Sequence, residues 1–424
     1  MYRAMRRVCS APLRGLTAAV LAVALAVAAG CGSSGSSEPA CGPSGRSGVG
    51  SWGIRSGNPA MVALHGMATV WTPQGWFLYG GYGGGWQNPT CQEAPYSCRG
   101  GALYDPAADS WEVLDVAPFE EQFGGEVGTF GRDDASAVWD GADRVIVWGG
   151  EQRTGDEEPY LKAYQDGGIF HLSTRTWEYL PAPGGILGRG SHHLALWIGD
   201  GLFIWGGRGD DSVDLAPSGG VLRLEDPPRW EPTSGEARHV ANITRAVWTG
   251  EEVLLWGGSQ GNGPVTDTGA AYRPETRSWR PLSMEGAPSS RGGHSAVWTG
   301  SEMIVFGGVH ERALNDFERQ RDGAAYNPRT DSWRPISLKG APSARASHVA
   351  VWTGTQMLIW GGQEGCPAGA LYDPEKDEWT PMSADGAPPG VWNPFHAWTG
   401  EQLLVRGGGI NHLYSFRGIG VFTP

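Results

Sequence analysis

The sequence predicts an all-β fold in which seven four-stranded blades form a closed ring. Three features lead to this prediction: a Gly-Gly doublet that recurs about every fifty residues, an apolar run before each doublet, and a tryptophan at a constant distance from the next doublet. The doublets stand at residues 80–81, 149–150, 206–207, 257–258, 307–308, 361–362 and 407–408. One unit cannot cover both faces of its own sheet, so neighbouring units must cover each other.

The strands of one unit follow from its apolar runs and its turn residues. The first strand ends at a Trp-Thr-Gly turn, as at residues 298–300. The second strand is the apolar run that closes on the doublet, such as Val253–Trp256. The third strand ends at a Tyr-x-Pro turn. Five residues past each of these prolines stands the tryptophan that starts the fourth strand, at positions 111, 279, 333 and 379.

The spacing also predicts how the ring closes. From Trp333 to Gly361 is 28 positions, and Trp52 stands the same distance before Gly80. Trp52 is therefore a fourth-strand tryptophan without a blade of its own, while the other end of the chain stops where a fourth strand would begin. We expect residues 51–54 to supply that strand, so that the seventh blade contains both ends of the chain and no sheet edge stays open.

These motifs resemble those of kelch-repeat proteins, in the galactose oxidase and kelch propeller superfamily. The resemblance covers roughly residues 52–424 and is weakest in the second and third units, where Phe170-His171-Leu172 and Leu224-Glu225-Asp226 replace the Tyr-x-Pro turn. It implies a seven-bladed kelch-type β-propeller over residues 49–424, with a partner or substrate bound on the face of the second-to-third loops. The long segments expected there are 82–100, 114–130, 151–166, 208–218 and 309–322.

The first 48 residues predict export and a lipid anchor. Residues 1–30 combine four arginines with an apolar run too short to span a bilayer, which is typical of a signal peptide. Ala28-Ala29-Gly30-Cys31 resembles the bacterial lipobox, in which the cysteine is acylated; an ordinary signal with a chance cysteine is the alternative. Residues 31–48 then form a flexible Gly/Ser-rich tether. We expect an exported protein that is lipid-anchored to the bacterial cell envelope.

The charge of the chain excludes some classes of partner. Removal of residues 1–30 takes away four arginines and no acid, so the formal charge changes from -13 to -17. This acidic balance argues against nucleic acid and against electrostatic binding to anionic lipid. We expect a monomer that meets the membrane only through its lipid and that binds a protein or a glycan.

Four cysteines remain for disulfides once the signal peptide is removed and Cys31 is acylated. Cys91 and Cys98 are the expected pair because they lie close together in the sequence, which leaves Cys41 with Cys366 by elimination. No C-x-x-C or clustered Cys/His spacing occurs, so we expect no metal site and no cofactor. The copper site of galactose oxidase-like enzymes would also need a free cysteine and a further domain after the propeller.

Arginine and histidine recur where the first strand of a blade begins, on the loop side of the central channel. The pairs are Arg189 with His193, Arg291 with His294, and Arg345 with His348. A ring of such donors would suit a carboxylate or another anion. The alternative is structural, because the histidines stand in a repeated H-x-A-x-W frame and each would then bond a neighbouring backbone group.

A second hypothesis is an envelope enzyme that acts on an acidic sugar. Sialate-epimerase-like proteins are kelch propellers of the bacterial envelope, and similarity to them would imply an acid/base carboxylate beside arginines at the channel. Glu151 is the candidate, because it is the only carboxylate that directly follows a double glycine. The sequence gives no second signal that pairs with Glu151, so binding of a protein or glycan is the favoured function.

Overall fold

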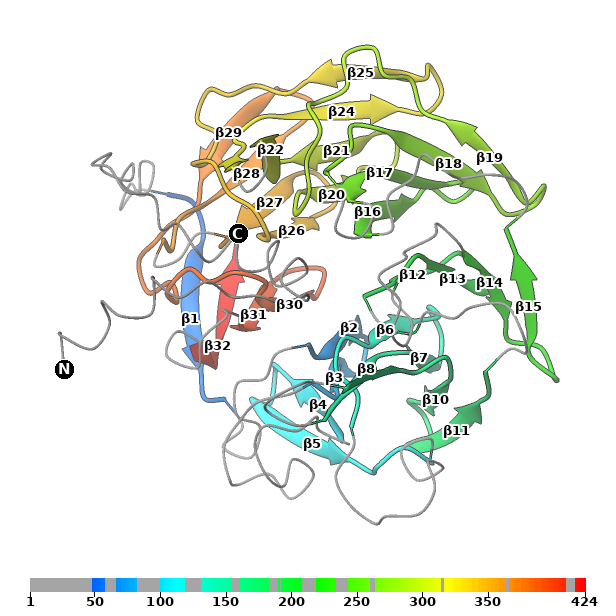
Figure 1. The fold of residues 1–424 in the computed structure, drawn as a ribbon. Coiled ribbons are helices and arrows are strands. Elements are labelled where there is room, and N and C mark those ends of the chain that lie inside the picture. The colour runs from blue at the N-terminus through cyan, green and yellow to red at the C-terminus, as the bar shows by residue number, and fades with distance from the viewer. Residues whose placement is uncertain are drawn as a thin grey trace, which may run out of the picture.

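The computed structural model describes residues 48–57, 66–81, 100–118, 131–154, 160–182, 190, 192–207, 219–233, 243–259, 264–313, 316–362, 366–408 and 416–424. These residues form 32 strands, arranged in seven four-stranded sheets and two two-stranded sheets. The larger sheets stand around a common axis as the blades of a propeller (Figure 1). The predicted all-β ring of seven blades is confirmed.

In blades 1 to 6 the strands follow one another in chain order from the axis outwards, and the innermost strands of adjacent blades contact each other. The blades are: blade 1, β2 (Ala68–Thr72), β3 (Gly75–Tyr79), β4 (Gly101–Asp105) and β5 (Ser110–Leu114); blade 2, β6 (Ser136–Trp139), β7 (Arg144–Trp148), β10 (Gly167–His171) and β11 (Thr176–Leu180); blade 3, β12 (Leu194–Trp197), β13 (Gly201–Trp205), β14 (Gly219–Arg223) and β15 (Arg229–Pro232); blade 4, β16 (Ile243–Trp248), β17 (Val253–Ser259), β18 (Gly269–Arg273) and β19 (Ser278–Pro281); blade 5, β20 (Ser295–Trp298), β21 (Met303–Phe306), β24 (Gly323–Asn327) and β25 (Ser332–Pro335); blade 6, β26 (Val349–Trp352), β27 (Met357–Trp360), β28 (Gly369–Asp373) and β29 (Glu378–Pro381); blade 7, β30 (Phe395–Trp398), β31 (Leu403–Gly407), β32 (Phe416–Thr423) and β1 (Ser51–Arg55).

Blade 7 contains both ends of the described chain. Its outermost strand, β1, pairs antiparallel with β32 along all five of its residues, with Trp52 opposite Phe422. Val49, just before β1, exchanges backbone hydrogen bonds of 2.9 and 2.8 Å with the end of β29 and the link after it in blade 6. The closure predicted for residues 51–54 is therefore confirmed, and the strand extends one residue further.

Among the described residues, the hydrophobic core consists of seven clusters, one between each pair of neighbouring blades. The second strands are buried along their whole length, as β3 and β13 show, except that β7 begins with the partly exposed Arg144. Between blades 4 and 5, for example, Leu254 and Trp256 of β17 join Val305 of β21 and Trp333 of β25 in one cluster. An apolar run is needed in each second strand because a neighbouring blade covers each of its faces.

The fourth-strand tryptophans join each blade to the blade before it. Trp333 of blade 5 packs edge-on against Trp256 of blade 4, with ring centroids 5.5 Å apart, and its indole N–H donates to the Ser283 carbonyl at 2.9 Å. Trp379 of blade 6 and Trp52 of blade 7 repeat both contacts with the blade before them. Packing between blades thus explains the constant tryptophan spacing.

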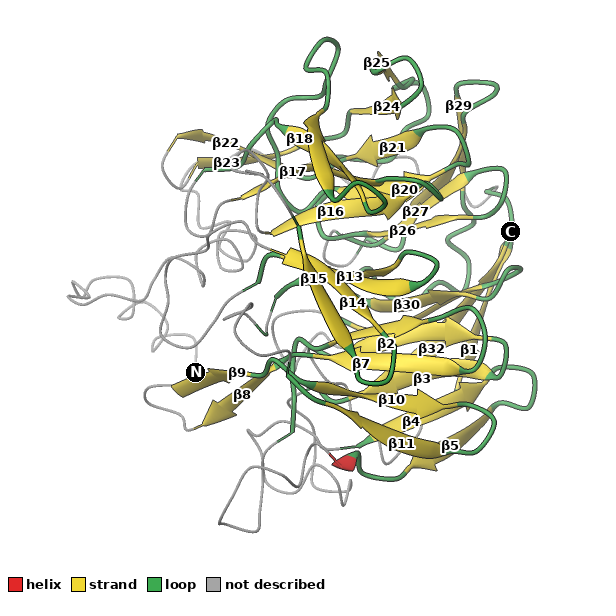
Figure 2. Ribbon diagram, turned by 90° about the vertical axis from the view of Figure 1, so that its right-hand side faces the viewer, coloured by secondary structure: helices red, strands yellow, loops and turns green. Residues whose placement is uncertain are grey.

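The two faces of the ring differ. The first-to-second and third-to-fourth connections are short turns and form what we term the turn face, whereas the second-to-third connections form the loop face. In blades 2 and 5 these loop-face connections contain hairpins, β8 (Glu151–Thr154) with β9 (Tyr160–Ala163) and β22 (Val309–Ala313) with β23 (Asp316–Arg319). Both hairpins project to the same side of the ring in Figure 2. The sequence predicted these segments as loops, because such short polar strands lack an apolar pattern.

Candidate functional site

The loop-face ends of the innermost strands form a ring of similar backbone positions. Just before the innermost strand, six blades have a described residue with left-handed backbone, at φ between 45° and 64°: Gly66, Asp134, His192, Gly293, Ser347 and Asn393. Backbone hydrogen bonds join this ring across blades, as where the Ser347 N–H donates to the Gly293 carbonyl at 2.8 Å. The residue type at this position differs from blade to blade, so the fold itself does not require a particular side chain there.

The repeated histidines pack against the first glycine of the doublets. A Cβ atom on Gly307 would lie 2.8 Å from Cε1 of His348, and one on Gly257 would lie at the same distance from Cε1 of His294. Both glycines are also left-handed, with φ of 66° and 63°. The two repeated motifs therefore depend on each other, because only glycine leaves room for the imidazole of the next blade.

The same histidines lie between neighbouring blades, His294 buried and His193 and His348 half-buried. Nε2 of His193 lies 2.8 Å from Ser136 Oγ, and Nε2 of His348 lies 2.8 Å from Ser295 Oγ, each serine belonging to the preceding blade. Burial lowers the pKa of His193 to about 4, that of His294 to about 3, and that of His348 well below its usual range. These imidazoles carry no charge at neutral pH, and they join blades rather than attract an anion.

Arg291 and Arg345 lie in the blade walls, with 0 % exposure. Arg345 donates from Nη1 to the carbonyls of Gly361 and Ala368, both at 2.9 Å. Arg291 makes the equivalent contacts in blade 5, and its Nη1 also lies 2.8 Å from Oδ1 of Asp322. The structure thus places these two guanidinium groups inside the blade walls and not in the ligand-facing ring that the sequence predicted. Each cation instead donates to two backbone carbonyls, that of the first glycine of the doublet and that of the residue just before the third strand.

Several residues singled out from the sequence lie outside the described residues. They are Arg189, Cys31, Cys41, Cys91 and Cys98. Cys366 is described, is 3 % exposed and is not a free thiol. The lipid anchor and the cysteine pairing therefore stay predictions.

A cation on the innermost strand of blade 4 was missed in the sequence. Arg245 of β16 takes the register position that Ser136 holds in β6 and Ser295 holds in β20. Its side chain is exposed to solvent, but the blades around it partly desolvate the guanidinium and so lower the pKa of Arg245. Burial and then the charge of Arg245 also lower the pKa of His294 in blade 5, so the guanidinium acts across the blade boundary. The only sequence signal was one arginine inside a motif that elsewhere carries small or apolar residues.

Glu151 lies at the base of the β8–β9 hairpin and is buried, with a side chain 2 % exposed. Its Oε2 is 3.7 Å from Nδ1 of His192, whose Nε2 is 3.3 Å from Oδ2 of Asp134. Blades 2 and 3 thus bring two carboxylates and one imidazole together at the loop-face end of the axis. The sequence singled out Glu151 but did not connect it with the other two, because both stand at the ring position where residue type varies.

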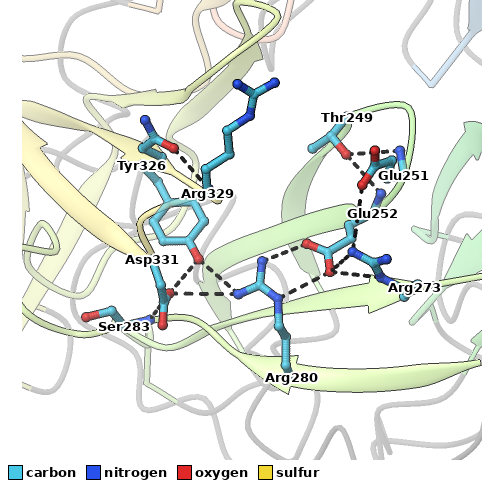
Figure 3. A network of polar contacts seen from close by, with 10 residues as sticks. Thr249, Glu251, Glu252, Arg273, Arg280, Ser283, Tyr326, Arg329 and Asp331 are labelled. Atoms are coloured by element: carbon cyan, nitrogen blue, oxygen red, sulfur yellow. Dashed lines mark hydrogen bonds and ion pairs between the residues drawn. The ribbon is translucent and has the colours of Figure 1, made fainter. Parts of the chain in front are cut away.

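The turn face between blades 4 and 5 holds a charged network (Figure 3). Arg280 of β19 donates to Glu252 at 2.6 Å and to the hydroxyl of Tyr326 in blade 5 at 3.1 Å, and Tyr326 donates to Asp331 at 2.6 Å. A cavity of about 260 Å³ lies beside this network. The same contacts recur between blades 5 and 6, in Glu302, Arg334, Tyr372 and Asp377. A network that repeats from blade to blade is scaffold, so the loop face is the better candidate for function.

Comparison with known families supports the fold assignment. Residues 243–422 match the family model of the KLHDC2/KLHL20/DRC7 Kelch-repeats domain. The matched segment contains blades 4 to 6 and three strands of blade 7. Together with the ring of seven blades, this similarity identifies the fold as a kelch-type β-propeller. In the described part of the chain, no helix is both long and apolar enough to cross a membrane.

Proposed function

We propose that this chain is a lipid-anchored binding module of the bacterial cell envelope, and that its propeller holds a protein partner on the loop face. The observation that supports binding most directly is the difference between the two faces. In the described part of the chain, the turn face consists of short repeated turns, whereas the loop face carries two added hairpins on a rigid ring. Binding residues are commonly placed on loops that a rigid scaffold positions.

The β22–β23 hairpin offers a suitable contact surface. In β23, Asp316 and Glu318 are exposed, while Phe317 between them is half-buried. At its base, His310 Nδ1 lies 2.8 Å from the Ser290 carbonyl, which ties the hairpin to the link before blade 5. A hairpin with a fixed base and polar outer positions presents a surface of constant shape, which lowers the entropic cost of binding.

The enzyme hypothesis has less support. A reaction on an acidic sugar would need a carboxylate among arginines that face the substrate. Arg291 and Arg345 are instead buried in the blade walls, and Glu151 faces His192 and Asp134. We therefore favour a binding module over a sugar-converting enzyme.

We expect the partner to bind the loop face of the propeller. A photo-crosslinking amino acid at Asp316 on the β23 hairpin is expected to give a discrete crosslinked protein in intact cells. The same probe at Ser301, an exposed residue of a turn-face turn, is expected to give none. Equal crosslinking from both positions, or crosslinking from Ser301 alone, would contradict a loop-face partner. If neither position crosslinks and the chain binds specifically on a glycan array, the partner is a glycan.

Acylation at Cys31 is a separate part of the proposal, and it rests on the lipobox-like sequence and the Gly/Ser-rich tether. Cells fed an alkynyl fatty acid should label the protein, and Cys31→Ser should lose both the label and membrane association. A variant that is labelled as strongly as the wild type would rule out this anchor. A test of the binding face can then still be made, because the crosslinking experiment does not depend on the lipid.

A further inference from the structure

Three residues from two blades meet at the loop-face end of the axis. Asp134 precedes β6, Glu151 begins β8, and His192 precedes β12. Each offers one ligand atom, two carboxylate oxygens and one imidazole nitrogen, and these atoms all lie within 4.8 Å of one another. The chain therefore gathers, at one point, three side chains of the types that bind metal ions in proteins.

The backbone holds this group in place. Glu151 exchanges backbone hydrogen bonds with Asp133: the Glu151 N–H donates to the Asp133 carbonyl at 2.7 Å, and the Asp133 N–H donates to the Glu151 carbonyl at 2.9 Å. The Glu151 side chain is 2 % exposed, whereas those of His192 and Asp134 are 30 % and 28 % exposed. The carboxylate of Glu151 thus forms the buried side of the group, whereas the side chains of His192 and Asp134 are partly exposed to solvent.

The propeller contains its own control for this site. Between blades 5 and 6, the equivalent positions carry Gly293, Val309 and Ser347. The backbone there is the same: the Val309 N–H donates to the Gly292 carbonyl at 2.8 Å and the Gly292 N–H donates back at 2.9 Å. The fold therefore forms without any ligand-type side chain at these three positions, and packing does not explain why blades 2 and 3 carry all three.

We propose that Asp134, Glu151 and His192 bind a divalent transition-metal ion of the Zn²⁺ class. An imidazole in the set favours zinc and similar ions over Mg²⁺ and Ca²⁺, which prefer oxygen ligands alone. Zinc bonds of about 2.0–2.1 Å in tetrahedral geometry place neighbouring ligand atoms roughly 3.4 Å apart, so ligand atoms that now lie within 4.8 Å of one another would need to approach by up to about 1.4 Å. Three protein ligands leave a coordination position open toward the solvent, where a group of a bound partner can enter.

This inference does not depend on the proposed protein partner, and it differs from what the sequence alone predicts. The sequence contains no clustered Cys/His spacing and therefore led us to expect no metal. The three ligands come from separate positions in two blades, so only the packing of blade 2 against blade 3 brings them together.

Calorimetric titration with Zn²⁺ tests the proposal directly, using protein purified without a histidine tag and treated with chelator. The wild type should bind one ion that His192→Ser and Glu151→Val each weaken by at least about 100-fold, since loss of a ligand should cost no less than loss of a residue supporting one. Both substitutions introduce residue types found at the equivalent positions of blades 5 and 6, so both variants should fold. His171→Asn is the matched control, because His171 also lies 3.3 Å from each of two carboxylates, Asp143 and Glu178, on the surface. That variant should bind zinc as the wild type does.

A second readout separates metal binding from a change in stability. Co²⁺ in place of zinc should give visible absorption bands in the wild type and in His171→Asn, and none in His192→Ser. Melting curves in EDTA establish that each variant is folded, and the milder His192→Asn and Glu151→Gln replace any variant that is not. Absence of zinc binding in the wild type would overturn the proposal, as would equal affinity in folded variants. In either case the group is a set of polar contacts between His192 and two carboxylates.

Discussion

Deletion of residues 48–55 should lower the melting temperature by many degrees, because the outer strand of blade 7 is lost. Its five residue pairs with β32 disappear, and so do the contacts of Trp52 with Trp360 at 5.2 Å and with Phe422 at 5.1 Å. The deletion also leaves β32 as an open sheet edge, which favours aggregation. Circular dichroism melts measure the loss of stability, and the m-value in urea should fall as well, since m follows the surface that unfolding exposes.

Two point variants on β1 refine this prediction. Trp52→Ala should cost up to about 3 kcal/mol, because it removes a large packed ring and a hydrogen bond to the Ser383 carbonyl at 3.0 Å. Ile54→Ala is the control on the same strand, since Ile54 is 53 % exposed and should change stability by less than about 0.5 kcal/mol. If the deletion melts like the wild type, the ring is not closed by β1. Equal melting of the two point variants would show that β1 contributes no packing.

Arg345→Ala should destabilise the protein by roughly 3 kcal/mol without weakening partner binding. The guanidinium is 0 % exposed and donates to three carbonyls, those of Ser343, Gly361 and Ala368. Its burial lowers the pKa of Arg345 to about 10, as expected for a cation held away from water. Truncation removes these charge-assisted hydrogen bonds and leaves buried carbonyls without a donor, each a cost of about 1–3 kcal/mol before water enters.

Arg329→Ala is the matched control for this variant. Arg329 is exposed on the turn face, and its loss should change stability by less than about 0.5 kcal/mol. Affinity of Arg345→Ala for the partner identified by crosslinking should stay within about twofold of the wild type. The opposite pattern, unchanged melting with a large loss of affinity, would restore the earlier hypothesis that this arginine faces a ligand.

Much of the fold could be predicted because its determinants are local and repeated. The glycine doublet, the Trp-Thr-Gly turn and the spaced tryptophan each specify a turn or a contact with the adjacent blade, and each occurs in several units. The spacing from Trp52 to Gly80 even indicated the closing strand. The hairpins β8–β9 and β22–β23 could not be predicted in this way, since each occurs once and lacks an apolar face.

The candidate site was predicted less well, and the arginines show why. Arg291 and Arg345 follow the repeat, and in the structure they serve it by bonding the carbonyls at the doublets. A charged residue that recurs in register is thus more readily explained by the scaffold than by a ligand. Arg245 and Glu151 break the repeat, and both lie where the innermost strands and the loop face meet.

By itself, the sequence determined the number of blades, the order of their strands and the closure of the ring. It could do so because a blade packs only against its neighbours, so the same short patterns recur wherever the same contacts are made. Only the tertiary structure decided which polar side chains meet. Asp134, Glu151 and His192 lie far apart in the chain, at positions whose backbone the fold fixes but whose side chains it leaves free to vary. Their proximity follows from the way two blades meet at the axis, and no local pattern records that geometry.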